Sequence, residues 1–143
     1  MKKVLSVFII ALFAVAMTAC NKMNETEEMI LGEWEETEVI GTMTIDGVTG
    51  EPVSMLEPGE TTTMTFKKNH TYTSTWHTAE GDVSSNGTWS AEDNTLTMSN
   101  SFGPLDYHID ALDKSSMVLT YTETGVDELG FYSTYIIMKL KKI

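Results

Sequence analysis

From residue 32 onward, hydrophobic and polar residues alternate in short runs separated by turn-forming residues. In the run Leu105–Ala111, four apolar residues alternate with Asp106, His108 and Asp110, so the two kinds of side chain fall on opposite faces of an extended chain. The runs are rich in Thr, Tyr, Val and Ile, which favour strands, and none has the period of a helix. The pattern predicts eight strands, at residues 33–46, 61–68, 70–78, 82–90, 94–99, 104–112, 115–124 and 131–141.

The connections between these strands indicate how they pair. Most are short, and residues 68–70, 91–94 and 113–115 suit hairpin turns. Strands joined by hairpins pair antiparallel with their neighbours, and eight strands with one apolar face each close naturally into an up-and-down barrel. Their other faces carry Thr, Ser, Asp and Lys, which indicates water outside rather than lipid. We therefore expect an all-β, eight-stranded antiparallel barrel, with a two-sheet sandwich as the alternative.

The apolar faces predict an interior rich in aromatic residues and Met, a set suited to adaptable ligand contacts. One connection, residues 46–60, is too long for a hairpin and carries Val53, Met55 and Leu56. It is either a lid over a cavity mouth or a mobile surface loop. The interior is either a ligand site or a core filled by its own side chains. The predicted interior residues are Met64, Phe66, Tyr72, Trp76, Trp89, Leu96, Met98, Tyr107, Ile109, Met117, Leu119 and Tyr121.

The first twenty residues have the features of an export signal. Two lysines precede an apolar run over residues 4–17, which is short for a bilayer span but typical of a signal-peptide core. The segment Met17–Cys20 resembles the lipobox of bacterial lipoproteins. The resemblance implies cleavage after Ala19, attachment of a diacylglycerol to Cys20 and acylation of the new N-terminus with a chain such as palmitate. The alternatives are an ordinary secretory signal that leaves a free Cys20, and an uncleaved anchor.

A polar, acidic segment links this signal to the strands. We expect three segments: a lipoprotein signal peptide at 1–19, an acidic tether at 20–29 and a barrel domain at 30–143. In the Gram-negative lipoproteins that the chain resembles, Asp after the cysteine often marks retention at the inner membrane. Asn21 stands there instead, so we expect a lipid-anchored protein of the outer membrane, facing the periplasm or the cell surface.

Composition and charge narrow the function. The chain has 21 Asp and Glu, nine Lys and no Arg, for a net charge of −12, or −14 once residues 1–19 are removed. Such a chain is a poor nucleic-acid binder. We interpret Asp106, His108 and Asp110, and the acidic run at 33–38, as solvated outer faces. The chain shows no catalytic-triad order and no Gly-rich phosphate loop. We predict no catalytic residues, no metal, no cofactor and a monomer.

The order of several short motifs resembles the lipocalin-like domain of small bacterial lipoproteins. They are Leu31–Trp34 at the first strand, a Phe66–Tyr72 hairpin, Gly87–Trp89, and the closing strand Tyr135–Lys142. The resemblance covers residues 30–143 and implies a barrel whose apolar cavity opens at one end, beside the first interstrand loop. Lipocalins commonly place an Arg over the first-strand Trp and add a C-terminal helix; this chain has no Arg.

The resemblance implies a non-enzymatic envelope lipoprotein that binds a small hydrophobic ligand. The alternative is a filled barrel that serves as a protein-interaction or accessory module at the outer-membrane surface.

Overall fold

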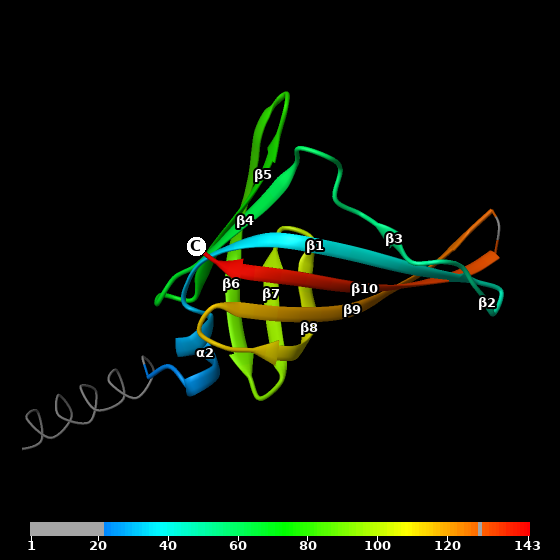
Figure 1. Cartoon of the computed structure of the whole chain (residues 1–143). Helices are drawn as coiled ribbons and strands as arrows, with labels where there is room; N and C mark the ends of the chain where they lie inside the picture. Colours follow the sequence, from blue (N-terminus) through cyan, green and yellow to red (C-terminus); the bar gives the residue numbers. More distant parts are fainter. Residues whose placement is uncertain (1–21, 129) are drawn as a thin grey trace, which may run out of the picture.

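Short hairpins join most neighbouring strands in the computed structural model, which describes residues 22–128 and 130–143 (Figure 1). Strand β1 pairs antiparallel with β4 on one side and with β10 on the other, so the sheet closes on itself. The predicted eight-stranded barrel is confirmed and the sandwich alternative is wrong. The barrel strands are β1 (Gly32–Ile45), β4 (Thr61–Phe66), β5 (Thr71–Thr78), β6 (Gly81–Glu92), β7 (Thr95–Asn100), β8 (Gly103–Leu112), β9 (Ser116–Asp127) and β10 (Gly130–Lys142).

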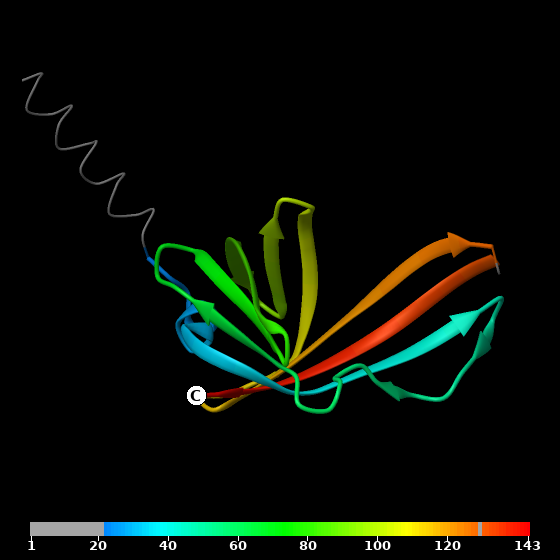
Figure 2. The same cartoon turned by 90° about the horizontal axis from the view of Figure 1, so that it is seen from above.

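Strands β1, β9 and β10 are longer than the closed part of the barrel. Strand β1 pairs with β4 only over Gly32–Glu35, and β8 pairs with β9 only as far as His108 opposite Thr120. Beyond these points β1, β9 and β10 continue together, away from β4–β8, as Figure 2 shows. We call residues 40–45, 121–127 and 130–137 the arm. The barrel therefore opens where the arm diverges.

The long connection after β1 folds back along the same strand. Its first turn contains Asp46 and Gly47, both with positive φ (48° and 82°), a conformation that favours glycine and tolerates Asp. The two-residue strands β2 (Val48–Thr49) and β3 (Val53–Ser54) both pair with β1. The Met55 N–H then donates a hydrogen bond of 2.8 Å to the carbonyl of Val39. The connection is thus held against β1 up to the barrel mouth.

Two bulges change which residues face inward. In β1 the register shifts between Glu36 and Glu38, so the buried positions change from Trp34 and Glu36 to Val39 and Gly41. In β8 the register shifts between Ile109 and Ala111. Strict alternation predicts an inward Ala111; that is wrong, because the bulge exposes Ala111 and turns Leu112 toward the core.

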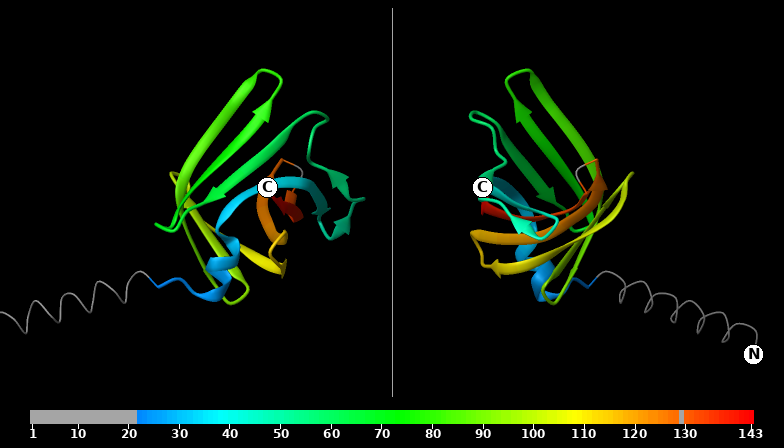
Figure 3. Two further views of the ribbon diagram at one scale, coloured as in Figure 1. Left: turned by 60° about the vertical axis from the view of Figure 1, so that its left-hand side comes forward. Right: turned by 90° about the vertical axis from the view of Figure 1, so that its right-hand side faces the viewer.

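Helix α2 (Glu25–Ile30) covers the end of the barrel opposite the β5–β6 hairpin (Figure 3). Asn24 caps the helix, and Ile30 is fully buried. Residues 25–29 therefore belong to the fold, so the predicted acidic tether is too long at its C-terminal side. Within the described residues, no helix is long and apolar enough to cross a membrane. The predicted signal peptide and Cys20 lie outside those residues. The fully buried side chains of the core include Ile30, Trp34, Phe66, Leu96, Met117 and Leu119.

Candidate functional site

A cavity of about 470 Å³ opens at the barrel mouth, where the arm leaves the other strands. This volume is in the range of small-molecule sites. Strands β1, β4, β5, β8, β9 and β10 contribute to its wall, together with the end of the long connection. The lining residues are Glu36, Val39, Met55, Leu56, Glu57, Glu60, Thr62, Met64, Ser74, Trp76, Tyr107, Tyr121, Ile136 and Met138.

The predicted interior residues divide into two groups. Met64, Trp76, Tyr107 and Tyr121 line the cavity. The others lie outside its lining and pack in the core: Phe66, Tyr72, Trp89, Leu96, Met98, Ile109, Met117 and Leu119. The barrel is therefore filled toward the α2 end and hollow at its mouth.

Trp76 lies on the rim of the cavity rather than inside the barrel. It lines the cavity as predicted, but 46% of the residue is exposed, so it is less enclosed than the other predicted interior residues. The reason is that β5 continues beyond the segment in which β4 pairs with β1, and the wall around Trp76 is incomplete. Its indole Nε1–H donates a hydrogen bond of 3.1 Å to Oε2 of Glu60. This bond fixes the indole beside the entrance.

Eight lining residues were not predicted from the sequence, and Glu36 is the buried acidic residue among them; the others are Val39, Glu57, Glu60, Thr62, Ser74, Ile136 and Met138. Only 8% of Glu36 is exposed, and burial raises the pKa of its carboxyl, opposed in part by a hydrogen bond with the side chain of Thr62. The acidic run at 33–38 was interpreted as one solvated face, which is wrong at this position. Alternation from the inward Trp34 was the available signal, because positions i and i+2 of a strand share a face.

Two tyrosines line the same cavity as Glu36. The rings of Tyr107 and Tyr121 meet edge to face, with centroids 5.1 Å apart. Burial, assisted by nearby acidic groups that include Glu36, raises the pKa of both phenols. Both hydroxyls therefore stay protonated at neutral pH and remain available as hydrogen-bond donors and acceptors.

The residues predicted as a lid are split by the structure. Met55 and Leu56 line the cavity. A Cβ atom on Gly41 would lie only 2.7 Å from Sδ of Met55, so the thioether packs directly on the backbone of β1. Val53 lies outside the lining, in β3, and is 63% exposed. The part of the long connection that lines the cavity is therefore the segment that follows β3.

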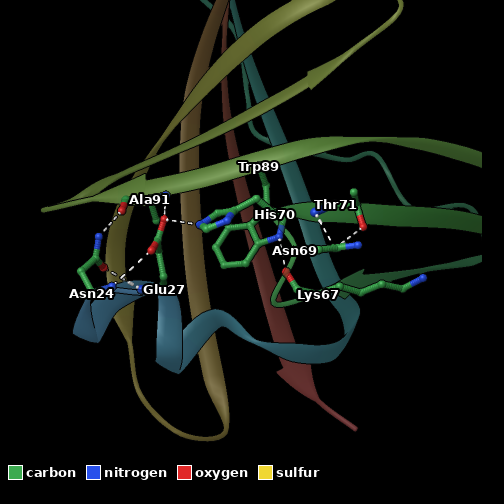
Figure 4. A network of polar contacts seen from close by, with 8 residues as sticks. All are labelled: Asn24, Glu27, Lys67, Asn69, His70, Thr71, Trp89 and Ala91. Carbon is green, nitrogen blue, oxygen red and sulfur yellow. Dashed lines mark hydrogen bonds and ion pairs between the residues drawn. The ribbon is translucent and has the colours of Figure 1, made fainter. Parts of the chain in front are cut away.

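A polar network ties α2 to the closed end of the barrel (Figure 4). The Glu27 carboxylate accepts hydrogen bonds from the backbone N–H groups of Asn24 (3.2 Å) and Ala91 (3.4 Å). It also contacts Nε2 of His70 at 3.1 Å. The His70 ring lies against Trp89, with centroids 5.5 Å apart. This network explains how a buried glutamate is accommodated, and it lies away from the cavity.

The histidine and acidic residues on β8 remain at the surface. His108 contacts Asp110 at 3.4 Å, and Asp106 accepts a hydrogen bond from the hydroxyl of Thr97. In the part of the chain that the structure describes, no three His, Cys, Asp or Glu side chains are grouped so that they could hold a metal ion.

Comparison with known proteins agrees with this geometry. No curated protein matches the chain significantly. The sequence pattern of the lipocalin-like domain matches residues 30–119. The match runs from the end of α2 into β9, and the structure adds the strand that closes the barrel. With more than half of its length matched, the chain belongs to the lipocalin-like domain family.

Proposed function

We propose that this barrel binds a small hydrophobic ligand at its mouth and that it does so without catalysing a reaction. The observation that carries the proposal is the cavity of about 470 Å³ above a packed core. Its walls combine apolar side chains such as Val39, Met64 and Met138 with a few polar groups, as ligand sites do. The lipocalin-like fold supports binding rather than catalysis.

Ligand occupancy tests the proposal directly. Native mass spectrometry of the protein purified from its native cells should detect a non-covalently bound small molecule. This molecule should be lost when a larger side chain fills the cavity. A Met64→Trp substitution adds volume inside the cavity, whereas Met43→Trp adds the same volume at an exposed position of β1. The bound mass should disappear only in the Met64 variant. Absence of binding to any member of a broad panel of apolar compounds would refute the proposal.

We further propose that the protein is anchored by lipid on Cys20 in the outer membrane. The lipobox-like segment and Asn21 support this location. Cys20→Ala should move the protein from the membrane fraction to the soluble fraction. Unchanged fractionation would contradict lipid attachment at Cys20.

The arm supports a second function, that of an interaction module. It carries exposed apolar side chains, among them Val126 (78% exposed) and Phe131 (56% exposed), and clustered apolar surface often marks contact sites. A photo-crosslinker at position 131 should capture a defined partner in cells, whereas one at Phe102, exposed on the β7–β8 turn, should not. Equal labelling from both positions would argue against the arm as an interface.

A further inference from the structure

We propose that the cavity selects an organic cation, an ammonium group carried on an apolar body, and that the Glu36 carboxylate binds the charge. The inference rests on the proposed ligand-binding function and specifies its ligand class.

The charges of the lining give the first argument. Three of the fourteen lining residues, Glu36, Glu57 and Glu60, carry carboxyl groups, and none of the fourteen is Lys, Arg or His. A ligand with its own carboxylate, such as a fatty acid, would lie beside like charges without a basic partner. An ammonium group would instead be attracted by the whole set. Charge complementarity thus favours the cation.

The position of Glu36 gives the second argument. It lies on β1 and shares the cavity lining with Val39, Tyr107 and Tyr121, and it is more than nine-tenths buried. An ionised carboxyl in such a place is costly without a positive partner. Burial raises the pKa of Glu36, and a cation beside it would favour the ionised form again. A neutral hydrocarbon would give the carboxylate no such partner.

The aromatic side chains give the third argument. Trp76 stands at the rim, and Tyr107 and Tyr121 form an edge-to-face pair in the same lining as Glu36. Faces of Trp and Tyr attract ammonium groups through the ring quadrupole, and binding sites for quaternary ammonium ions commonly combine such rings. Met64, Ile136 and Met138 supply the apolar wall for the rest of the ligand.

The approach to the cavity carries the same charge. A neighbouring hollow of about 580 Å³ shares Glu60 and Trp76 with it and also contains Glu80 and Asp82. No basic residue lines this hollow either, although Asp82 contacts Nδ1 of His77 at 3.0 Å. Acidic walls on both sides of Trp76 would raise the local concentration of cations at the entrance.

The test compares three benzyl compounds of similar size and different charge. Benzyltrimethylammonium is the cation, neopentylbenzene is its neutral carbon isostere, and 3-phenylpropionate is the anion. The full chain is held in micelles of dodecyl maltoside, a non-ionic detergent, and labelled with 5-fluorotryptophan at its three Trp positions, with empty micelles correcting for partition into detergent. The ¹⁹F signal of Trp76 reports on the cavity, and those of the buried Trp34 and Trp89 report on the fold.

We expect the cation to shift the Trp76 signal with at least tenfold higher affinity than the isostere or the anion. Glu36→Gln should remove this preference while leaving the affinity for the isostere unchanged, and Glu33→Gln, which removes an exposed charge from the same strand, should keep it. Unaltered Trp34 and Trp89 signals show that each variant is folded. Equal or tighter binding of the isostere or the anion overturns the inference and leaves the proposed function standing. If none of the three ligands binds, and no member of a broad panel of apolar compounds binds either, both the inference and the proposed function are overturned.

Discussion

The Nζ atom of Lys142 lies 4.9 Å from the ring centroid of Trp34 and also donates a hydrogen bond of 3.0 Å to the carbonyl of Met29. One lysine of the last strand thus covers the first-strand tryptophan and binds the last turn of α2, where a positive charge is favourable. Trp34 in turn donates from Nε1 to the carbonyl of Ile30. In this chain without Arg, Lys142 occupies the place over Trp34 that lipocalins commonly give to an Arg.

Replacing Lys142 should loosen this junction. Lys142→Gln removes the cation from the ring and from the helix end, and we expect it to lower the free energy of unfolding by about 1–2 kcal/mol. Lys142→Arg should keep most of the stability, because a guanidinium also stacks on aromatic rings. Urea denaturation measures the effect. Lys141→Gln, at the exposed neighbouring position, is the control, and an equal loss in that variant would contradict a specific role.

The buried Glu27 carboxylate should be essential for docking of α2. Glu27→Ala leaves the Asn24 and Ala91 N–H groups and the His70 ring without their acceptor. We expect a loss of about 2–3 kcal/mol and faster hydrogen exchange in α2 and at the start of β1. Glu28→Ala removes a similar charge from the exposed side of the same helix and should change little. Unaltered exchange in the Glu27 variant would show that the network does not hold the helix.

Gly87 makes room for the core. A Cβ atom there would overlap the carbonyl oxygen of Ser99 and lie 2.7 Å from Cε1 of Tyr72. Gly87→Ala must therefore displace backbone or a buried ring, and we expect a loss of about 1–3 kcal/mol. Gly50→Ala, whose nearest atom is the Met43 carbonyl oxygen at 3.5 Å, should be tolerated. Thermal unfolding of the two variants compares them, and equal melting temperatures would refute the steric argument.

Alternation predicted the strands well because each barrel strand has one face on the core. The eight predicted ranges differ from β1 and β4–β10 by only a few residues at their ends. Alternation failed where a bulge intervenes, as at Ala111, because an extra residue reverses every later position and its location depends on tertiary strain. Alternation also cannot show how far a pair of strands extends beyond the neighbouring strands. That difference in length creates the arm and the cavity mouth.

The residues of the candidate site were also predicted only in part. Met64, Tyr107 and Tyr121 were predicted correctly, because each lies on the apolar face of its alternating strand. Glu36 lies two residues after Trp34 and so on the same face of the strand. It was nevertheless predicted to be solvated with its acidic neighbours, because carboxyl groups are seldom buried. The helical end of the acidic segment was missed because six residues are too few to show a helical period. Its capping box, Asn24 with Glu27, was the local signal.

The Asp113 turn should titrate at unusually low pH. Hydrogen bonds from the backbone N–H of Ser115, and from the side chain and backbone of Ser116, lower the pKa of Asp113 to about 2. Because the folded pKa lies below the ordinary 3.8, the ionised turn stabilises the fold above pH 3.8, and this contribution is lost as the pH falls through about 2. Carboxyl ¹³C NMR should show the low midpoint. Ser116→Ala should raise it, and an unchanged midpoint would contradict this cause.

Glu36 should titrate in the opposite direction. Its pKa is raised above the ordinary 4.5 in the folded chain because the carboxyl is buried, so folding favours the protonated form. Its contribution to stability is therefore fully present below pH 4.5 and is lost as the pH rises through the folded pKa. The glutamine side chain of the Glu36→Gln variant cannot ionise. At pH 7 the variant should thus unfold at a higher urea concentration than the unsubstituted protein, with the difference disappearing below pH 4.5.

The exposed Glu33 gives the matched control for this pH profile. Glu33→Gln removes the same charge from the outside of β1 and should not reproduce the pH-dependent gain. A Glu36→Gln variant that is less stable than the unsubstituted protein at pH 7 would mean that the ionised carboxylate stabilises the empty barrel. If instead the substitution stabilises the barrel and removes cation binding, then Glu36 is retained at the expense of stability, as is common for residues that serve a binding site.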